Sequence, residues 1–382
     1  MNIKTTLKAS VAAAALFAVA VPVAEAGSVS NGNGNSVTLS GQVNKAVMYF
    51  DDGKSEDMAV VDNDNSGTRF RILGSGKVNE AVSVGTALEV EFQDNAANNW
   101  SIADANSNGG AGTDAFGQTN FNQRRAEAYI SHKQFGKVSI GQGPTASDGT
   151  AETSLSGAGM AAGGGFNFND NGQVIRSTAD TNDTFTAART WGTKMTNLDG
   201  LSRNDRVRYD SPTFAGFQVS GSALSSGAAD VALRYGGKFG GVKVKAAGSY
   251  VNQGASSATV DAQWVVSAAA EHESGLNVRG QYGQRDMTVT TRDDPTAWAV
   301  GLGYDASLTS MGTTSFAVGY HVVEDLAANN EEATMIDFGV VQHIKDAGTE
   351  LYAAVSLLEF EDSTATSYED ATSIIAGTRI KF

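Results

Sequence analysis

The residue types that most often carry catalysis are present in this chain, but their spacing does not bring a reaction centre together. None of the four histidines has the HExxH-type spacing that sets two histidines on one helical face around a zinc ion; they are His132, His272, His321 and His343. No serine is paired with a nearby histidine and acid, as a nucleophilic centre would need. The glycine-rich stretches 141–143 and 163–165 lack, respectively, the strand-to-helix setting of a dinucleotide loop and the Lys-Ser or Lys-Thr of a phosphate loop. The sequence therefore predicts a protein that is not an enzyme and that has no metal site and no cofactor.

Arginines spaced two residues apart are the charged groups with an informative pattern. Arg69 and Arg71 fall on one face of a predicted strand, because successive side chains of a strand point to opposite faces. Arg206 and Arg208 share a face of another predicted strand in the same way. Each pair therefore puts two positive charges on the same face of a predicted strand.

Short segments of alternating apolar and polar residues occupy almost the whole chain outside one long stretch. In the clearest, 82–93, Val82, Val84, Leu88 and Val90 alternate with polar or small residues. Sixteen such strands are predicted, at 37–49, 68–76, 82–93, 124–132, 137–142, 204–210, 214–223, 230–238, 242–252, 259–271, 276–285, 296–304, 314–323, 334–344, 350–360 and 371–382. This pattern predicts an all-β fold.

The connections between these strands alternate between short and long. Tight turns such as Gly240-Gly241 alternate with long acidic loops such as 51–66, 94–122 and 324–333. Outer-membrane barrels have short turns at one rim and long loops at the other, whereas a soluble sandwich has no reason for this asymmetry. The last strand ends on Phe382, and closing it onto the first strand would leave no unpaired edge in lipid. We therefore predict a transmembrane antiparallel β-barrel of about sixteen strands.

Residues 143–201 do not alternate. They are rich in Gly, Ala, Ser, Thr and Asn, with scattered acids that include Asp148 and Glu152. Structureless loops of this length are uncommon and are usually functional or disordered. We expect this third long loop to fold into the mouth of the barrel and to narrow it; a disordered surface loop is the alternative.

The first residues carry an export signal. Lys4 and Lys8 precede an apolar core at 11–23 and a small-residue site at 24–26, which predicts a cleaved signal peptide over 1–26 and a barrel over 27–382. A retained membrane anchor is the alternative. The formal net charge of −15 argues against a nucleic-acid partner, because phosphate binding needs basic surface. There is no cysteine, so an exported fold must rely on packing and hydrogen bonds rather than on disulfides.

Four segments resemble the general diffusion porins of Gram-negative outer membranes. Residues 377–382 (GTRIKF) look like the porin C-terminal strand with its final Phe, 66–74 (SGTRFRILG) are similar to the second strand, and 124–142 look like the fourth and fifth strands. The most specific match is 204–217 (NDRVRYDSPTFAGF), which closely resembles the motif after the porin constriction loop. The resemblance implies an outer-membrane channel for passive diffusion of small hydrophilic solutes and ions. It also implies a homotrimer, in contact with membrane lipid and lipopolysaccharide, whose third loop folds inward.

By that resemblance, basic residues of the barrel wall face acidic residues of the inward loop. The matched basic positions are Arg69 and Arg71, Arg125 (or Arg124), and Arg206 and Arg208; the matched acids are Asp148 and Glu152. Gln142 departs from the pattern, because many relatives carry Arg there. Opposed charge rows in a low-dielectric collar create a transverse field that favours polar solutes. From the net acidity we expect a mild cation preference.

Two other functions stay open at this point. A substrate-specific channel for sugar or phosphate is one, although sugar channels favour an aromatic slide and more strands, and only 8% of the residues here are aromatic. A secreted β-rich surface protein or adhesin is the other, and it predicts neither the terminal Phe nor the alternation of short and long turns. The acidic outer loops could also bind divalent cations, which prefer oxygen ligands, but the sequence defines no such site.

Overall fold

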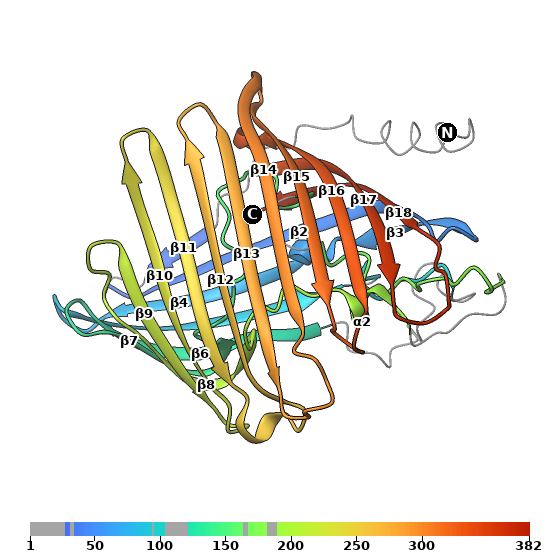
Figure 1. Ribbon diagram of the computed structural model, residues 1–382. Coiled ribbons are helices and arrows are strands. Elements are labelled where there is room, and N and C mark those ends of the chain that lie inside the picture. Colours follow the sequence, from blue (N-terminus) through green and yellow to red (C-terminus); the bar gives the residue numbers. More distant parts are fainter. Residues whose placement is uncertain (1–26, 31–33, 94, 104–120, 163–166, 182–188) are drawn as a thin grey trace.

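Sixteen long strands wind into one closed wall in the computed structural model, which describes residues 27–30, 34–93, 95–103, 121–162, 167–181 and 189–382 (Figure 1). They are β2 (Ser36–Asp51), β4 (Arg69–Lys77), β5 (Val82–Phe92), β6 (Phe121–His132), β7 (Gly136–Pro144), β8 (Arg203–Asp210), β9 (Phe217–Leu224), β10 (Ala229–Phe239), β11 (Val242–Asn252), β12 (Val260–His272), β13 (Leu276–Met287), β14 (Thr296–Thr309), β15 (Gly312–Glu324), β16 (Glu332–Ile344), β17 (Thr349–Glu361) and β18 (Ala371–Lys381). Each strand pairs antiparallel with its neighbours in the wall. The predicted all-β barrel is confirmed, whereas the predicted signal peptide, residues 1–26, lies outside the described residues.

Helical structure is minor. The described helices are α2 (Trp191–Lys194) and three single 3-10 turns, η1 (Asp64–Ser66), η2 (Gly254–Ser256) and η3 (Lys345–Ala347). Within the described ranges, no helix combines the length and the apolar character needed to cross a bilayer.

The wall closes where β18 pairs with β2. This pairing runs from Thr372 opposite Asp51 to Lys381 opposite Gln42. Backbone hydrogen bonds of 2.8 and 3.0 Å then join Gly41 and Phe382 in both directions. Closure leaves the wall strands without a free edge, which is the condition for crossing lipid.

The segment 51–66, expected to be a loop, contains a further strand. β3 (Glu56–Asp62) turns back and pairs with the end of β2, from Asp51 opposite Glu56 to Lys45 opposite Asp62. A second short strand, β1 (Gly27–Ser30), pairs with the start of β2. β2 is longer than its neighbour β4, and both short strands satisfy backbone groups of β2 that β4 and β18 do not reach. Their weak alternation explains why the sequence pattern missed them.

The two faces of the wall differ in chemistry, as the alternation predicted. On β5, Leu88 points outward and is half exposed, whereas Glu89 points inward and is buried. Outward positions on β13 to β16 are likewise large and apolar, including Leu276, Leu302 and Phe316. An apolar exterior is what lipid requires.

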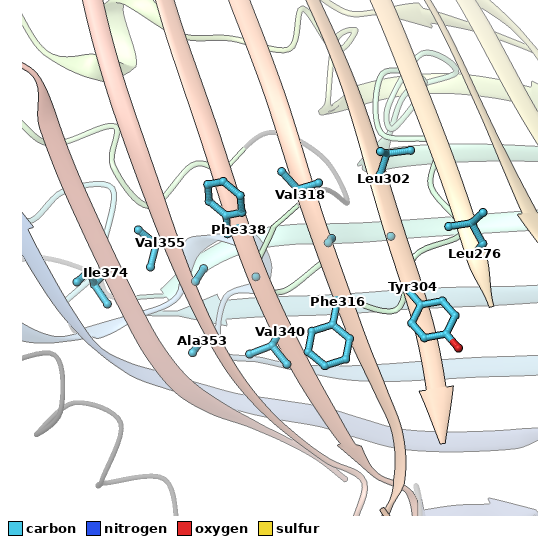
Figure 2. Close-up of a pocket in the computed structure, with 14 residues that line it drawn as sticks. Leu276, Leu302, Tyr304, Phe316, Val318, Phe338, Val340, Ala353, Val355 and Ile374 are labelled. Carbon is cyan, nitrogen blue, oxygen red and sulfur yellow. The ribbon is translucent and has the colours of Figure 1, made fainter. Parts of the chain in front are cut away.

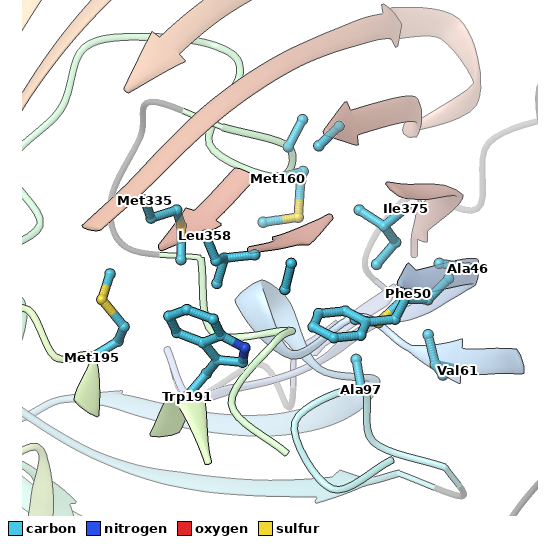
Figure 3. Close-up of a cluster of buried hydrophobic side chains, with 14 of the residues drawn as sticks. Ala46, Phe50, Val61, Ala97, Met160, Trp191, Met195, Met335, Leu358 and Ile375 are labelled. Atoms are coloured by element: carbon cyan, nitrogen blue, oxygen red, sulfur yellow. The ribbon is translucent and has the colours of Figure 1, made fainter. Parts of the chain in front are cut away.

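The inner face of the wall is apolar in one part. Inward residues near the long-loop ends of β2, β16, β17 and β18 are apolar and buried: Met48, Phe50, Met335, Leu358 and Ile375. They pack against residues from the long third loop, including Met160, Ile175, Trp191 and Met195 (Figure 3). The loop therefore shields these positions from lumen water, and burial of apolar surface stabilises the arrangement.

Candidate functional site

A basic cavity of about 410 Å³ lies on the inner side of β4 and β6. Its charged lining consists of six cationic residues and one carboxylate: Arg69, Arg71, Arg124, Arg125, Arg203, Lys381 and Glu89. Three of the five predicted basic positions, Arg69, Arg71 and Arg125, therefore lie in one cavity. Both candidates at 124 and 125 line it, because a register shift in the pairing of β5 with β6 follows Glu89 and brings consecutive residues to the same side.

Some of these cations are neutralised and others are not. Arg124 forms ion pairs with Glu89 (Nε to Oε1, 2.7 Å) and Glu91 (Nη1 to Oε2, 2.8 Å). Arg69 donates to Ser66 Oγ at 2.7 Å and lies 3.8 Å from Glu89. The side chain of Arg71 donates only to Ser40 Oγ, at 3.3 Å, and the side chain of Arg203 has no hydrogen bond or ion pair to any described residue. The cavity therefore keeps unpaired positive charge.

Arg206 and Arg208 have a different position from the one expected. Arg206 is buried, forms an ion pair with Glu127, and donates to the carbonyls of Gly141 (2.7 Å) and Pro144 (3.0 Å). Arg208 pairs with Asp210 and donates to the carbonyl of Thr145 at 2.6 Å. Both side chains thus hold the backbone where the long loop leaves β7, and neither lines the basic cavity.

The predicted acids lie in a second region, around the start of the loop. Glu152 lines a cavity of about 410 Å³ together with Arg234 and Lys245. Asp199, from the far end of the same loop, accepts hydrogen bonds from the backbone of Gly149 (2.7 Å) and Ala151 (2.8 Å). Asp148 contributes its backbone carbonyl to Arg234 at 2.8 Å. Among the described residues no ion pair joins Asp148 or Glu152 to the predicted arginines.

Burial and neighbouring carboxylates raise the pKa of two of these acids, Glu152 and Asp199. Enclosure by the barrel and the nearby charges of Asp199 and Asp148 raise the pKa of Glu152 to about 7. Burial likewise raises the pKa of Asp199, against the lowering effect of its backbone hydrogen bonds. The Glu152 side chain is exposed, so water screens part of this effect. This carboxyl therefore changes charge near neutral pH.

Inward wall side chains bond to the backbone of the loop along residues 146–157. Asp230 of β10 accepts from Ser147 N at 2.8 Å, and Ser267 of β12 donates to the carbonyl of Thr150 at 2.5 Å. Arg279 of β13 donates to the carbonyl of Ala151 at 3.2 Å. The ring Nε2 of His343, on β16, lies 3.0 Å from the carbonyl of Gly157. These bonds follow the loop across four strands of the wall.

Sequence reasoning missed several of these residues. Arg203 directly precedes the recognised 204–217 motif, and Glu89 and Glu127 lie on polar strand faces, so alternation could have placed the two acids inside. Asp230 and Asp199 carried no local signal, because their partners lie far away along the chain. In the described part of the chain, no group of three His, Asp or Glu side chains is arranged to hold a metal ion.

An apolar hollow lies on the outer wall. It measures about 700 Å³ and is a groove between two cross-strand rows of outward side chains on β13 to β18 (Figure 2). Tyr304, Phe316 and Val340 belong to one row, and Val318 and Phe338 belong to the other. Its lining has no charged residue, which suits hydrocarbon rather than a hydrophilic solute.

A model of the Gram-negative porin family matches residues 9–363. The chain belongs to this family. It is accordingly an outer-membrane channel for passive diffusion of small hydrophilic solutes, in a family of channels rather than enzymes. A search of curated protein sequences found no match to this porin.

Solved porin structures share the fold of this porin at low sequence identity. The anion-selective porin from Comamonas acidovorans is 17% identical, with a TM-score of 0.60 over 91% of this chain and 100% of that one. In-vitro folded OmpT of Vibrio cholerae is 14% identical, with a TM-score of 0.57 over 94% and 100%. A trimer form of OmpT is 15% identical, with a TM-score of 0.56 over 91% and 99%. Such likeness supports the closed barrel itself.

Proposed function

We propose that the long third loop, predicted at residues 143–201, forms the constriction of this porin and that solutes pass beside the basic cavity. The observation that carries the proposal is the series of hydrogen bonds from inward wall side chains to loop residues 146–157. A segment held on the lumen side of four strands reduces the open cross-section. Pore width and lining charge then decide which solutes pass.

The charge around this opening favours small anions over cations of the same size. The basic cavity has five arginines and Lys381 against Glu89, a formal excess of five positive charges (6 − 1) among its lining side chains. Glu152, the acid facing the second cavity, is partly protonated near neutral pH. The acids of the outer loops act less strongly, because salt screens exposed charges beyond about 8 Å under physiological conditions. This sign replaces the cation preference expected from net charge, and one structural relative is an anion-selective porin.

Reversal potential across a planar bilayer in a salt gradient tests both statements. Replacing Arg203 or Arg71 with Gln is expected to shift the reversal potential toward the value of a cation-selective channel, because each substitution removes an unpaired positive charge from the cavity. Lys77→Gln is the matched control, since Lys77 is an exposed residue paired with Glu80 on a short turn. Equal reversal potentials in all four proteins would place the selective region elsewhere, and a protein without conductance would refute the channel.

We also propose that the porin is a homotrimer, with the contact on the outer side of β18, β2, β4, β5 and β6. Several outward residues there are small, namely Gly41, Gly74, Thr86, Ala126, Ala128 and Ala376, among larger apolar residues such as Leu88. Lys45 also points outward there, with its Nζ 2.8 Å from Asp62, and a lysine facing hydrocarbon costs up to about 2.5–3.5 kcal/mol. A protein neighbour is therefore a better cover for this face than lipid, and the trimer form of OmpT supports the stoichiometry.

The remaining outer wall suits membrane lipid. The groove of Figure 2 would take a hydrocarbon chain, and the tilted aromatic pairs Trp264–Tyr282 and Trp298–Tyr320 suit the headgroup region, which includes lipopolysaccharide in the outer leaflet. Export through a signal peptide at residues 1–26 is part of the same proposal.

A further inference from the structure

The pair β18 and β2 is the one place in the wall where neighbouring strands are not joined by a turn or loop. At the short-turn end, Phe382 continues the pairing onto Gly41. At the long-loop end, the pairing stops at Thr372 opposite Asp51. A segment with few tertiary contacts unfolds locally at a low free-energy cost. This end of the seam therefore needs another source of stability.

A segment from the middle of the chain lies across this end of the seam. Residues 174–180, which we name the strap, contact both loops that begin there. On the β18 side, Thr178 N donates to the carbonyl of Ser367 and Glu369 N donates to the carbonyl of Arg176, each at 2.9 Å. On the β2 side, Lys54 Nζ donates to the carbonyl of Thr178 at 3.1 Å. The strap therefore joins the first and last long loops to each other.

A buried ion pair lies at the centre of these contacts. Arg176 Nε is 2.5 Å from Asp52 Oδ2, and both side chains are 1% exposed. Arg176 also donates to Ser55 Oγ at 3.4 Å, in the same loop. Charges removed from water to this degree are stable only as partners, so losing either one removes a favourable buried contact and destabilises this junction.

The strap is in turn fastened to the apolar core of the barrel. Ile175 N donates to the carbonyl of Arg189 at 2.9 Å, and Trp191 N donates to the carbonyl of Gln173 at 3.0 Å. Ile175 and Trp191 are both buried in the apolar cluster, where Figure 3 labels Trp191. Movement of the strap would therefore disturb both the seam and the packing of the third loop.

We infer that the strap locks the long-loop end of the seam and that Arg176 is its positioning residue. The barrel is thereby closed by backbone pairing at one end of the seam and by a loop from the middle of the chain at the other. The link between this lock and solute passage rests on the proposed constriction; the effect on barrel closure does not.

An introduced disulfide makes the test specific, because the chain has no cysteine of its own. Ser177 faces Tyr368 in an isolated antiparallel bridge. The backbone hydrogen bonds flank this pair rather than join it, and such pairs have Cα atoms about 4.5 Å apart, within disulfide range. The Ser177→Cys/Tyr368→Cys pair would thus tie the strap to the loop before β18 without the ion pair.

The readout is the temperature at which the folded form converts to the unfolded form on a denaturing gel. Arg176→Gln and Asp52→Asn are each expected to lower it by about 4–7 °C, as loss of a buried ionic partner does in a chain of this size. The oxidised cysteine pair in the Arg176→Gln protein is expected to restore most of the loss, and reduction to remove the gain. Lys243→Gln is the control, since it breaks an exposed pair with Glu271 and should leave the temperature unchanged.

Two outcomes would overturn the inference: an unchanged conversion temperature in both ion-pair variants, or a disulfide that forms without restoring stability. Single-channel recording separates this result from the proposed function. A loosened strap is expected to increase current fluctuations in Arg176→Gln relative to Lys243→Gln. A wild-type protein that does not conduct would refute the channel proposal and leave the gel result standing as the test of the lock.

Discussion

Gly339 offers the most direct test of whether the long loop narrows the channel. It lies on the inner face of β16, under loop residues 158–162. A Cβ added there would be 2.6 Å from Ala161 Cβ, 2.7 Å from Ala162 Cβ and 2.8 Å from Ala162 N. Carbon atoms normally approach to about 3.5–4.0 Å, so Gly339→Ala requires a separation larger by about 1 Å. Strand pairing holds β16 on both sides, so we expect the loop to move, toward the lumen.

The expected result is a smaller channel and a less stable loop. A shift of about 1 Å at one side of a narrow opening removes roughly a tenth to a quarter of its area, and conductance should fall by a similar fraction. Overpacking of this kind costs about 1–3 kcal/mol. Single-channel conductance and the conversion temperature on a gel measure the two effects.

Gly221→Ala is the matched control for this substitution. Gly221 lies on β9, on the outer face, and the nearest atom to an added Cβ is the carbonyl oxygen of Asp230 at 3.7 Å. We expect wild-type conductance from this variant. If Gly339→Ala also conducts as the wild type does and converts at the same temperature, residues 158–162 take no part in the narrowing and the argument from loop contacts is refuted.

Two other predictions concern pH and assembly. The pKa of Glu152 is raised to about 7, so the carboxylate loses its charge as the pH falls through that value, and anion preference should increase between pH 8 and pH 5 in the wild type but not in Glu152→Gln. The folded state binds this proton more tightly than the unfolded state, so the charged carboxylate destabilises the fold above about pH 7. Acidification should therefore raise the conversion temperature of the wild type more than that of Glu152→Gln. An equal pH dependence of the conversion temperature in the two proteins would contradict the assignment. Ala128→Trp, on the proposed contact face, should release monomers on a sizing column in mild detergent, whereas Val300→Trp, on the large-residue side of the wall, should not. Trimers of Ala128→Trp would move the contact to another face.

Local alternation was enough to predict the wall. The side-chain period of a strand is two, so a sequence pattern of a few residues already assigns each side chain to lipid or lumen. For that reason Arg69 and Arg71 could be placed together, and so could the outward row of 82–93. The same local rule failed at β3, whose seven residues alternate poorly, and at the inner positions of Met48, Met335 and Ile375.

Those inner positions depend on what the long loop covers, and no local pattern contains that information. The grouping of Arg203 with Arg69, the burial of Arg206 under the loop, and the separation of Glu152 from the basic cavity have the same cause. Each depends on contacts between residues far apart in sequence, such as Arg176 with Asp52, 124 positions away. The sequence by itself therefore determined a closed barrel with a lipid side and a lumen side, because strand periodicity is a property of neighbouring residues. Only the tertiary structure decided which part of the lumen is filled and which charges face the remaining water, because those follow from where a long, weakly patterned loop meets the wall.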